Sequence, residues 1–407
     1  MEAHVPTACA VGYFISPAPR ACADVSGTMD PPTGGLELGV NSASRVRRLL
    51  VGVRVFGSDM QGEPDAGNWV TLLSDNQRTG RQSERSARTP ERMVWQLRLE
   101  NSVRSSPVLD DGLLYVPCLD GALHAIDVRT GREAWRRGNA KAIHSTPSLS
   151  RDRVLFGDDS GHVRALARDT GQELWAAPCG AEVWTSPVVY GNAVYCGSAD
   201  GRFYALDFQS GKVHWTFNAG ARIDSTAFVA ENRAWFGCGN GKVYCLDTVS
   251  GSIVWTATTG NGIDSSPALA DGLLLIGSED FSVYAMDAGT GKIHWKYATG
   301  LGIFSSPAVA ASTVMVGSKD GFLYALDIPT GRLKWKTRLS RVILAPPVVS
   351  GKTVYLQAFG GGTFALEIAT GRRIWRAGLG GSVQSCPVLA ENAVYLADMQ
   401  GMVYALA

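Results

Sequence analysis

Tryptophan recurs along this chain at a constant interval of forty residues. The series runs without slippage and comprises Trp95, Trp135, Trp175, Trp215, Trp255, Trp295, Trp335 and Trp375. A proline series, mostly preceded by Ser or Thr, and a Thr-Gly or Ser-Gly series keep the same interval. Their members are Pro107, Pro147, Pro187, Ala227, Pro267, Pro307, Pro347 and Pro387, and Gly131, Gly171, Gly211, Gly251, Gly291, Gly331 and Gly371. Because three registers agree on one period, residues 88–407 are eight tandem copies of one supersecondary unit.

One copy contains four short β-strands. Ser186–Tyr190, Ala193–Gly197, Phe203–Leu206 and Val213–Phe217 are separated by Gly and Asp punctuation. The third of these strands is apolar on both faces, as expected of a sheet that is covered on each side by another sheet. Each copy is therefore a four-stranded meander, and radial stacking of the copies supplies the cover.

The turn between the second and third strands carries an Asp-Gly or Asn-Gly pair in several copies. Such pairs tolerate the positive φ angles of a tight hairpin. We interpret them as turn formers and not as metal ligands. They are Asp120-Gly121, Asp200-Gly201, Asn240-Gly241 and Asp320-Gly321.

A forty-residue period also occurs in WD40 repeats and in helical HEAT arrays. Several Gly, a Pro and many β-branched residues in each copy exclude the helical arrays, and the Trp-Asp ending of WD40 repeats is missing. We therefore predict an all-β fold, an eight-bladed β-propeller of four-stranded antiparallel blades. The last copy stops at residues 404–407 without a fourth strand, whereas Met93–Leu97 is a fourth strand without a preceding three. We expect these two segments to pair and to close the ring, which removes both exposed sheet edges.

The segment Ala-Ile-Asp-Val-Arg-Thr-Gly-Arg-Glu-Ala-Trp at residues 125–135 resembles the tryptophan-docking motif of quinoprotein-type propellers, the family with pyrroloquinoline-quinone repeats. Parallel segments stand at 205–215, 285–295 and 325–335, and the resemblance covers all of 88–407. It implies that the periodic tryptophans are structural. Each ring is expected to cover the small Ala and the Thr-Gly turn of an adjoining blade. Complete burial of one ring contributes on the order of 4 to 5 kcal/mol.

The chain is expected to have three parts. Residues 1–65 show no period and are interpreted as a leader or tail, residues 66–87 as a lead-in segment, and residues 88–407 as the propeller. Trp69 and Arg78-Thr79-Gly80 resemble the lead-in of this family. Val5–Ile15 is mildly apolar and precedes Ala21-Cys22-Ala23, but no Lys or Arg comes before it, so the sequence leaves export open.

Composition excludes some classes of partner. The formal net charge is +1, without the basic excess that a phosphate backbone requires, so we expect no nucleic acid. No run of eighteen uncharged apolar residues occurs, so no transmembrane segment is expected. The eight cysteines are scattered and are interpreted mainly as small core residues, with a bridge between Cys238 and Cys245 left open.

Two classes of function compete. Quinoprotein dehydrogenases resemble this chain but carry long insertions that supply a carboxylate base and calcium ligands, and many have two adjacent cysteines. Here the copies have constant length and no Cys-Cys pair. The histidines show no metal-ligand spacing and are interpreted as structural: His4, His124, His144, His162, His214 and His294. We expect a non-catalytic scaffold without catalytic residues, cofactor or metal. The alternatives are a dehydrogenase using pyrroloquinoline quinone and calcium, and a propeller sensor or carbohydrate-associated binding module.

In architecture the chain is similar to the propeller scaffold of the outer-membrane β-barrel assembly machinery. This resemblance implies a protein, peptide or glycan partner and a periplasmic or other extracytoplasmic location. A cytoplasmic location is the alternative. We expect a monomer.

Positions that differ among the copies are free of the shared structural demand and are candidates for binding. One such set lies three residues before the proline series, directly after a β-branched residue. It is named the mouth column here, because we expect its side chains to surround one mouth of the central channel. Its members are Arg104, His144, Trp184, Asp224, Asp264, Phe304, Leu344 and Gln384. A solvated loop without function is the alternative interpretation, and Trp184 is the leading binding candidate.

Overall fold

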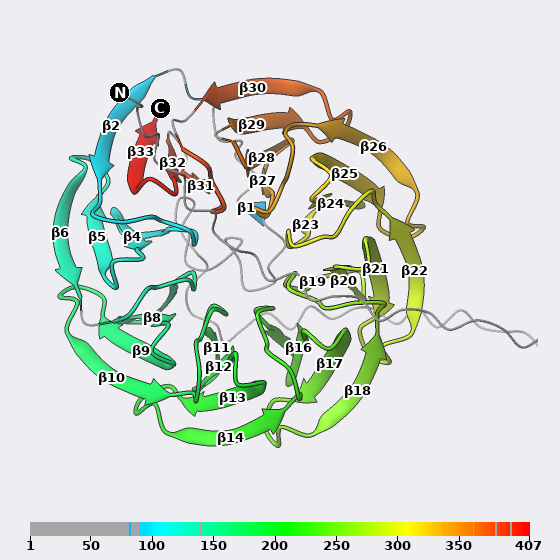
Figure 1. Ribbon diagram of the computed structural model, residues 1–407, viewed down its shortest axis with the longest axis horizontal. Coiled ribbons are helices and arrows are strands. Elements are labelled where there is room, and N and C mark those ends of the chain that lie inside the picture. The colour runs from blue at the N-terminus through cyan, green and yellow to red at the C-terminus, as the bar shows by residue number, and fades with distance from the viewer. Residues whose placement is uncertain are drawn as a thin grey trace, which may run out of the picture. The chain divides into compact units, whose positions relative to one another are not determined.

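A computed structural model describes residues 81–82, 90, 92–138, 140–360, 362–378, 381–390 and 393–407. In these ranges the chain forms eight sheets of four antiparallel strands around a common centre, one of which gains a fifth, parallel strand, and no helix occurs in them (Figure 1). The predicted all-β eight-bladed propeller is confirmed. The described residues accordingly contain no candidate membrane-spanning helix.

The strands follow one another from the inner to the outer edge of each blade. Blades 1 and 2 are β3 Val108–Asp110, β4 Leu113–Pro117, β5 Leu123–Asp127, β6 Arg132–Arg137, β7 Ser148–Ser150, β8 Arg153–Gly157, β9 His162–Ala167 and β10 Glu173–Pro178. Blades 3 and 4 are β11 Val188–Tyr190, β12 Ala193–Gly197, β13 Arg202–Asp207, β14 Val213–Asn218, β15 Phe228–Ala230, β16 Arg233–Gly237, β17 Lys242–Asp247 and β18 Ile253–Thr258. Blades 5 and 6 are β19 Ala268–Ala270, β20 Leu273–Ser278, β21 Ser282–Asp287, β22 Ile293–Ala298, β23 Ala308–Ala310, β24 Thr313–Gly317, β25 Phe322–Asp327 and β26 Leu333–Arg338. Blades 7 and 8 are β27 Val348–Ser350, β28 Thr353–Ala358, β29 Gly362–Glu367, β30 Arg373–Gly378, β31 Val388–Leu389, β32 Val394–Ala397, β33 Met402–Leu406 and β2 Met93–Arg98.

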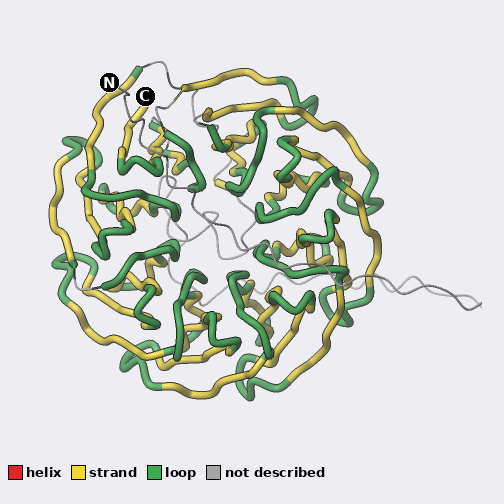
Figure 2. The backbone as a smooth tube through the Cα atoms, in the orientation of Figure 1, coloured by secondary structure: helices red, strands yellow, loops and turns green. Residues whose placement is uncertain are grey.

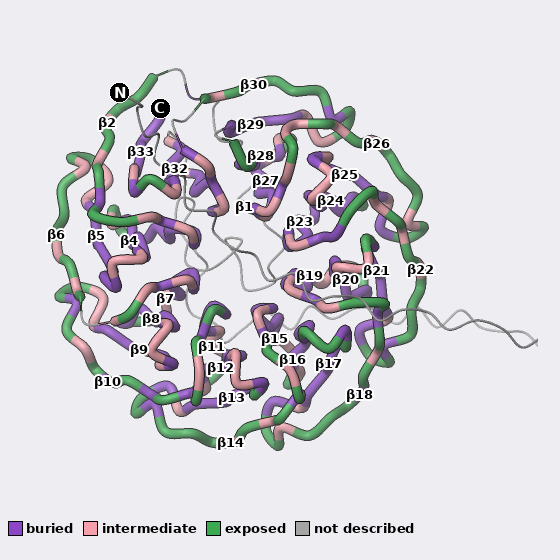
Figure 3. The backbone as a smooth tube through the Cα atoms, in the orientation of Figure 1, coloured by how far each residue is buried: buried purple, intermediate pink, exposed green. Residues whose placement is uncertain are grey.

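Burial falls from the second and third strands to the outer strand of each blade. In blade 3, Phe203, Tyr204, Ala205 and Leu206 are all buried, whereas the outer strand β14 alternates between exposed and half-buried residues (Figure 3). Neighbouring blades share the core. The ring of Phe203 stacks on that of Phe236 in blade 4 with centroids 4.3 Å apart. On the other face, Tyr204 belongs to a core cluster with Leu155 of blade 2, so this blade is covered on both faces as expected.

The periodic tryptophans from Trp95 to Trp335 each pack against the Thr-Gly or Ser-Gly turn of the next blade. The Trp215 indole N–H donates a 3.1 Å hydrogen bond to the Thr248 carbonyl oxygen, and a Cβ on Gly251 would lie 2.6 Å from the indole ring. Glycine is therefore required there for close approach. The glycines of this series have φ angles of +67° to +74°, which favour glycine as well. Six of the eight rings are half-buried, and only Trp175 and Trp255 are buried. The free energy given above for complete burial of one ring is therefore an overestimate for the other six.

The ring closes through its two ends. Outer strand β2 pairs antiparallel with β33, with Trp95 opposite Ala405 and Leu97 opposite Val403. The predicted closure is confirmed. The last tryptophan, Trp375, has no following Thr-Gly turn and donates instead to the Pro90 carbonyl oxygen at 2.9 Å.

Hydroxyl groups before the proline series link the blades near the centre. The backbone N–H of Ser186 donates to Thr226 Oγ1 at 3.0 Å, that of Thr226 to Ser266 Oγ at 3.0 Å, and that of Ser266 to Ser306 Oγ at 3.0 Å. Each bond satisfies a buried donor with a hydroxyl acceptor forty residues along the chain. This series explains why Ser or Thr precedes the proline in most copies.

The described cysteines are all buried and free, so no bridge joins Cys238 to Cys245. The free cysteines are Cys118, Cys179, Cys196, Cys238, Cys245 and Cys386. Burial raises the pKa of the Cys245 thiol to about 12, which keeps it protonated and unreactive. Cys9, Cys22, the apolar run Val5–Ile15 and Trp69 with Arg78-Thr79-Gly80 lie outside the described residues.

Candidate functional site

The mouth column lies in the connections between blades. Each connection leaves an outer strand, crosses one face of the ring as a loop and reaches the next inner strand near the centre (Figure 2). A repeated backbone bond fixes its position: Asp159 N–H donates to the Ala142 carbonyl at 3.0 Å, and Glu279 N–H donates to the Gly262 carbonyl at 3.0 Å. The loop before each blade is thereby joined to the turn after the second strand of that blade.

A buried anchor holds each member of the mouth column in place. Ile223, which precedes Asp224, is completely buried, and a Cβ on Gly197 would lie 2.3 Å from its Cγ2 atom. The same β-branched residue is buried before every other member. The following side chains are half-exposed, and Trp184 is the most open, with 39% of its surface exposed. A rigid backbone therefore presents side chains that the fold itself does not need.

The first part of the column is a contact chain across blades 2 to 4. The rings of His144 and Trp184 have centroids 4.8 Å apart, and Trp184 Nε1 donates to Asp159 Oδ1 at 2.8 Å. The Arg222 guanidinium lies over the Trp184 ring at 4.3 Å from its centroid. Arg222 Nε also pairs with Asp224 Oδ2 at 2.5 Å. Trp184 thus holds one cation on its ring face while its edge is bonded to a carboxylate.

The second part of the column is acidic and spans blades 4 to 6. Burial raises the pKa of Asp264 to about 6, and the charges of Asp224 and Glu279 add to the shift. Lys319 Nζ pairs with Glu279 Oε2 at 2.7 Å and lies 3.7 Å from the centroid of the Phe304 ring. Three carboxylates therefore share one region and are only partly neutralised.

Polar atoms at the mouth remain without partners. Among the described residues, the buried side-chain atoms that lack a hydrogen-bond partner include Arg104 Nε, Asp224 Oδ1 and Glu279 Oε1. A buried polar atom without a partner costs about 1 to 3 kcal/mol. Burial, together with Arg104, lowers the pKa of His144, although Asp159 opposes the shift. Three buried polar atoms in and beside the mouth column therefore have unmet hydrogen-bonding capacity.

The contact chain does not extend around the whole ring. Among the described residues, Leu344 and Gln384 make no polar or ring contact with other members of the mouth column. The sequence prediction also missed Asp159, Glu279 and Lys319, which lie in the turn after the second strand. That position varies among the copies too, so the same comparison applied there would have found it.

A short strand without a counterpart in the repeat lies at the inner edge of blade 7. β1, Arg81–Gln82, pairs in parallel with β27, with backbone partners Arg81 and Val349, and Gln82 and Ser350 (Figure 1). This strand is not evident from the sequence, because two residues carry no periodicity. An inner strand of this ring therefore accepts an extended segment on its free edge.

Comparison with known families now places the chain. A family profile described as "Beta-alanine-activating enzyme, beta-propeller" matches residues 190–407, and one described as "Outer membrane protein assembly factor BamB" matches residues 82–178 and 120–226. The first match covers more than half of the chain. The chain belongs to this family of β-propellers, built from pyrroloquinoline-quinone-like repeats as the tryptophan motif indicated. No curated protein sequence matches it.

Solved structures share the fold at low sequence identity. BamB from Moraxella catarrhalis is 21% identical with a TM-score of 0.68, and the match covers 77% of this chain and 98% of BamB. The computationally designed protein Ika8 is 19% identical with a TM-score of 0.68, covering 76% and 98%. Quinohemoprotein alcohol dehydrogenase from Comamonas testosteroni is 16% identical with a TM-score of 0.72, covering 83% and 80%. One fold thus serves a designed protein, an enzyme and an assembly factor, so function must be argued from the site.

Proposed function

We propose that this propeller is a non-catalytic scaffold that binds a basic peptide segment of a partner protein at the mouth column. The observation that carries the proposal is the group of partly unsatisfied carboxylates formed by Asp224, Asp264 and Glu279. A lysine or arginine side chain would supply the missing donors and would neutralise the repulsion among them.

Aromatic rings flank this acidic group on both sides. Trp184 already holds Arg222 over its face, and Phe304 already holds Lys319. These contacts indicate that both ring faces lie where cations gather, and cation–π contacts contribute about 0.5 to 2 kcal/mol each. A ligand cation that displaces either side chain would gain the same ring face and a carboxylate.

The peptide backbone has a second means of recognition. Arg104 Nε is a buried donor without a partner, and a ligand carbonyl or carboxylate oxygen would satisfy it. β1 is a precedent within this chain for an extended segment that pairs with an inner strand, since it adds a parallel strand to β27 and occupies that edge itself. A peptide therefore fits the mouth better than a compact small molecule.

The alternative cofactor fits these residues poorly. Pyrroloquinoline quinone carries three carboxylates, and the charges of Asp224, Asp264 and Glu279 would repel them. The two cations beside these carboxylates are already engaged, since Lys319 pairs with Glu279 at 2.7 Å and Arg222 pairs with Asp224 at 2.5 Å. Enzymes with this fold are known among the structural neighbours, but the mouth of this chain supports binding of a cation.

Fluorescence anisotropy with short labelled peptides tests the proposal. A peptide in which lysine alternates with glycine should bind, whereas its glutamate counterpart should not. The double variant Trp184→Ala with Asp224→Ala should weaken binding about 30-fold, the loss typical of an interface hot spot. Its melting temperature should stay within about 2 °C, since exposed loop residues contribute little to stability.

A matched control uses the two column members outside the contact chain. Leu344→Ala with Gln384→Ala should leave binding of the lysine peptide unchanged. Equal binding of the lysine peptide by the Trp184/Asp224 variant and the wild type would show that the binding site lies elsewhere. Tight stoichiometric binding of pyrroloquinoline quinone by the wild type would replace the scaffold proposal with the dehydrogenase alternative.

A further inference from the structure

Blade 1 contains a cluster of metal-ligand side chains that the repeat does not require. Cys118 follows β4, Asp120 lies in the turn, and His124 lies on β5 opposite Val116. A thiol sulfur, a carboxylate oxygen and an imidazole nitrogen of these residues lie within 4.8 Å of one another. His124 Nε2 is 3.4 Å from Asp120 Oδ2. Ligand atoms around a tetrahedral zinc ion are separated by roughly 3.3 to 3.8 Å, so only small side-chain movements are needed.

The imidazole directs an unused nitrogen into the cluster. His124 is only 2% exposed, and its Nδ1 atom is hydrogen-bonded to the Glu133 carboxylate. Its Nε2 atom is buried and has no hydrogen-bond partner. In the neutral imidazole, Nδ1 carries the proton toward Glu133, and Nε2 presents a lone pair to Cys118 and Asp120. A carboxylate behind a histidine in this way is the usual support of a metal-binding imidazole.

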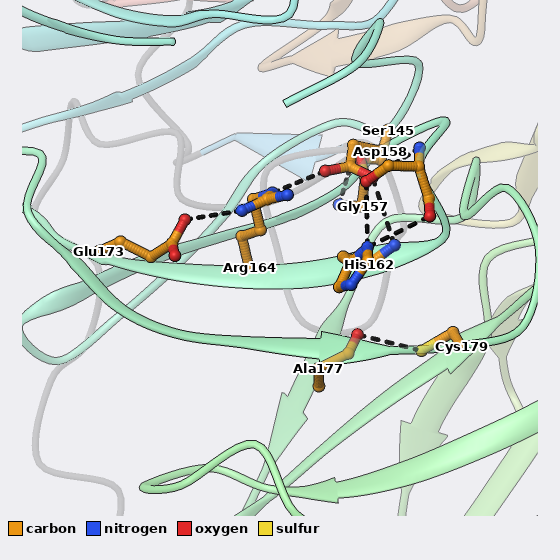
Figure 4. Close-up of polar contacts among 9 residues, drawn as sticks. Ser145, Gly157, Asp158, His162, Arg164, Glu173, Ala177 and Cys179 are labelled. Atoms are coloured by element: carbon orange, nitrogen blue, oxygen red, sulfur yellow. Dashed lines mark hydrogen bonds and ion pairs between the residues drawn. The ribbon is translucent and has the colours of Figure 1, made fainter. Parts of the chain in front are cut away.

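The equivalent position in blade 2 already holds a positive charge. The Arg164 guanidinium lies between two carboxylates: its Nε is 2.6 Å from Asp158 Oδ2, and its Nη1 is 2.7 Å from Glu173 Oε2 (Figure 4). Asp158 and Glu173 stand at the repeat positions of Cys118 and Glu133. Blade 1 therefore keeps a glutamate beside this point, Glu133, but has a shorter imidazole ring in place of the long guanidinium side chain.

Other blades fill the same position with tyrosine. Tyr204 donates its hydroxyl to Asp200 Oδ2 at 2.6 Å, and Tyr324 donates to Asp320 Oδ2 at 2.6 Å. These pairs leave no unused lone pair directed at the turn. Histidine in blade 1 is thus a departure from a satisfied structural pair.

The surrounding charges are suited to a divalent cation. Asp120, Glu133 and Glu100 are anionic, and Arg136 is the cation that contacts two of them, at 2.8 Å from Asp120 Oδ2 and 3.0 Å from Glu100 Oε2. Ionisation of Cys118 on metal binding would add one negative charge. The negative charges of these four groups would then outnumber the positive charge of Arg136, and a divalent ion would compensate the difference.

We propose that Cys118, Asp120 and His124 bind a zinc ion, with Glu133 orienting the imidazole. The thiolate sulfur, the carboxylate oxygen and His124 Nε2 are the three protein ligands, and the Cys118 proton is released to solvent. Thiolate, imidazole and carboxylate together select zinc over magnesium or calcium, which prefer oxygen ligands. A water molecule completes the tetrahedron. The ion ties the turn between β4 and β5 to the β5 strand.

Cobalt(II) titration of the full-length chain, freed of metal by a chelator and kept reduced, tests this site. The wild type should bind one equivalent and develop a sulfur-to-cobalt charge-transfer band. Cys118→Ser, which introduces the serine found at 198, should lose that band. His124→Tyr should weaken binding about 100-fold or more, and Glu133→Gln should weaken it about 10-fold. At zinc concentrations about 100 times the dissociation constant, the melting temperature of the wild type should rise by about 3 to 5 °C.

Blade 4 supplies a matched control. Cys238 occupies the same repeat position as Cys118, but it is accompanied by Asn240 and Tyr244, whose side chains bond each other at 3.0 Å. Cys238→Ser should leave cobalt binding intact. Absence of the charge-transfer band in the wild type would overturn the proposal and leave His124 as a structural partner of Glu133 and Asp120. Full binding by His124→Tyr would also overturn it. Melting curves verify that each variant is folded. Cys118→Ser and His124→Tyr are expected to fold, because they introduce residues that stand at the same positions in blade 3.

Discussion

Removing the negative charge of Asp264 should make the protein more stable at neutral pH. Burial and the neighbouring carboxylates raise the pKa of Asp264 to about 6, against 3.8 for an unperturbed aspartate. Each unit of difference corresponds to about 1.36 kcal/mol, so keeping Asp264 ionised in the folded state costs about 3 kcal/mol at most. Asp264→Asn removes this cost at nearly constant volume.

The pH dependence distinguishes this cause from a packing effect. Because the pKa is raised in the folded state, the folded protein binds the proton more tightly than the unfolded chain. The free-energy cost is therefore absent below about pH 4, grows between about pH 4 and pH 6, and is constant above about pH 6. Urea unfolding should show Asp264→Asn more stable than the wild type by about 1 to 3 kcal/mol at pH 7.5. At pH 4 the two proteins should unfold at similar urea concentrations.

An exposed aspartate provides the control. The Asp169 side chain is 90% exposed, so Asp169→Asn should not reproduce the pH-dependent gain. Equal stability of Asp264→Asn and the wild type at pH 7.5 would refute the reasoning, as would a gain of the same size at pH 4. A confirmed gain would mean that the mouth gives up stability to keep a carboxylate charged, which is common at binding sites.

Three further predictions concern binding, packing and closure. Affinity for the lysine peptide should fall as the pH drops through about 6, because Asp264 becomes neutral; a pH-independent affinity in anisotropy titrations would exclude a role for its charge. Trp215→Ala should cost roughly 3 kcal/mol in urea unfolding, the lower end for emptied aromatic sites, because the ring is half-buried; a loss under 1 kcal/mol would contradict the docking role. Deleting residues 88–98 should lower the melting temperature far more than deleting residues 1–60, because the edge of β33 becomes unpaired; equal melting temperatures would disprove closure by β2.

The sequence by itself determined the repeat, the strands and the closure. An unbroken forty-residue period gives every copy the same local structure. The strands predicted at Ala193–Gly197 and Val213–Phe217 therefore predict strands at the same positions of the other blades. The last copy lacks a fourth strand, and the strand predicted at 93–97 lacks the three that should precede it. Their pairing could be predicted because an unpaired sheet edge is unfavourable. Alignment of the copies by their period also distinguished the mouth column, whose residues vary, from the positions that all copies share.

Only the tertiary structure decided which side chains meet. Trp184 and Asp159 are 25 residues apart and belong to different blades, so their 2.8 Å bond has no signature in sequence spacing. The pairing of β1 with β27 is invisible for the same reason. The spacing of Cys118, Asp120 and His124 matches no familiar ligand motif, and they converge because a hairpin turn folds β5 back along β4. Local patterns fix backbone geometry, whereas burial, charge and ligand geometry depend on neighbours that the chain brings together from a distance.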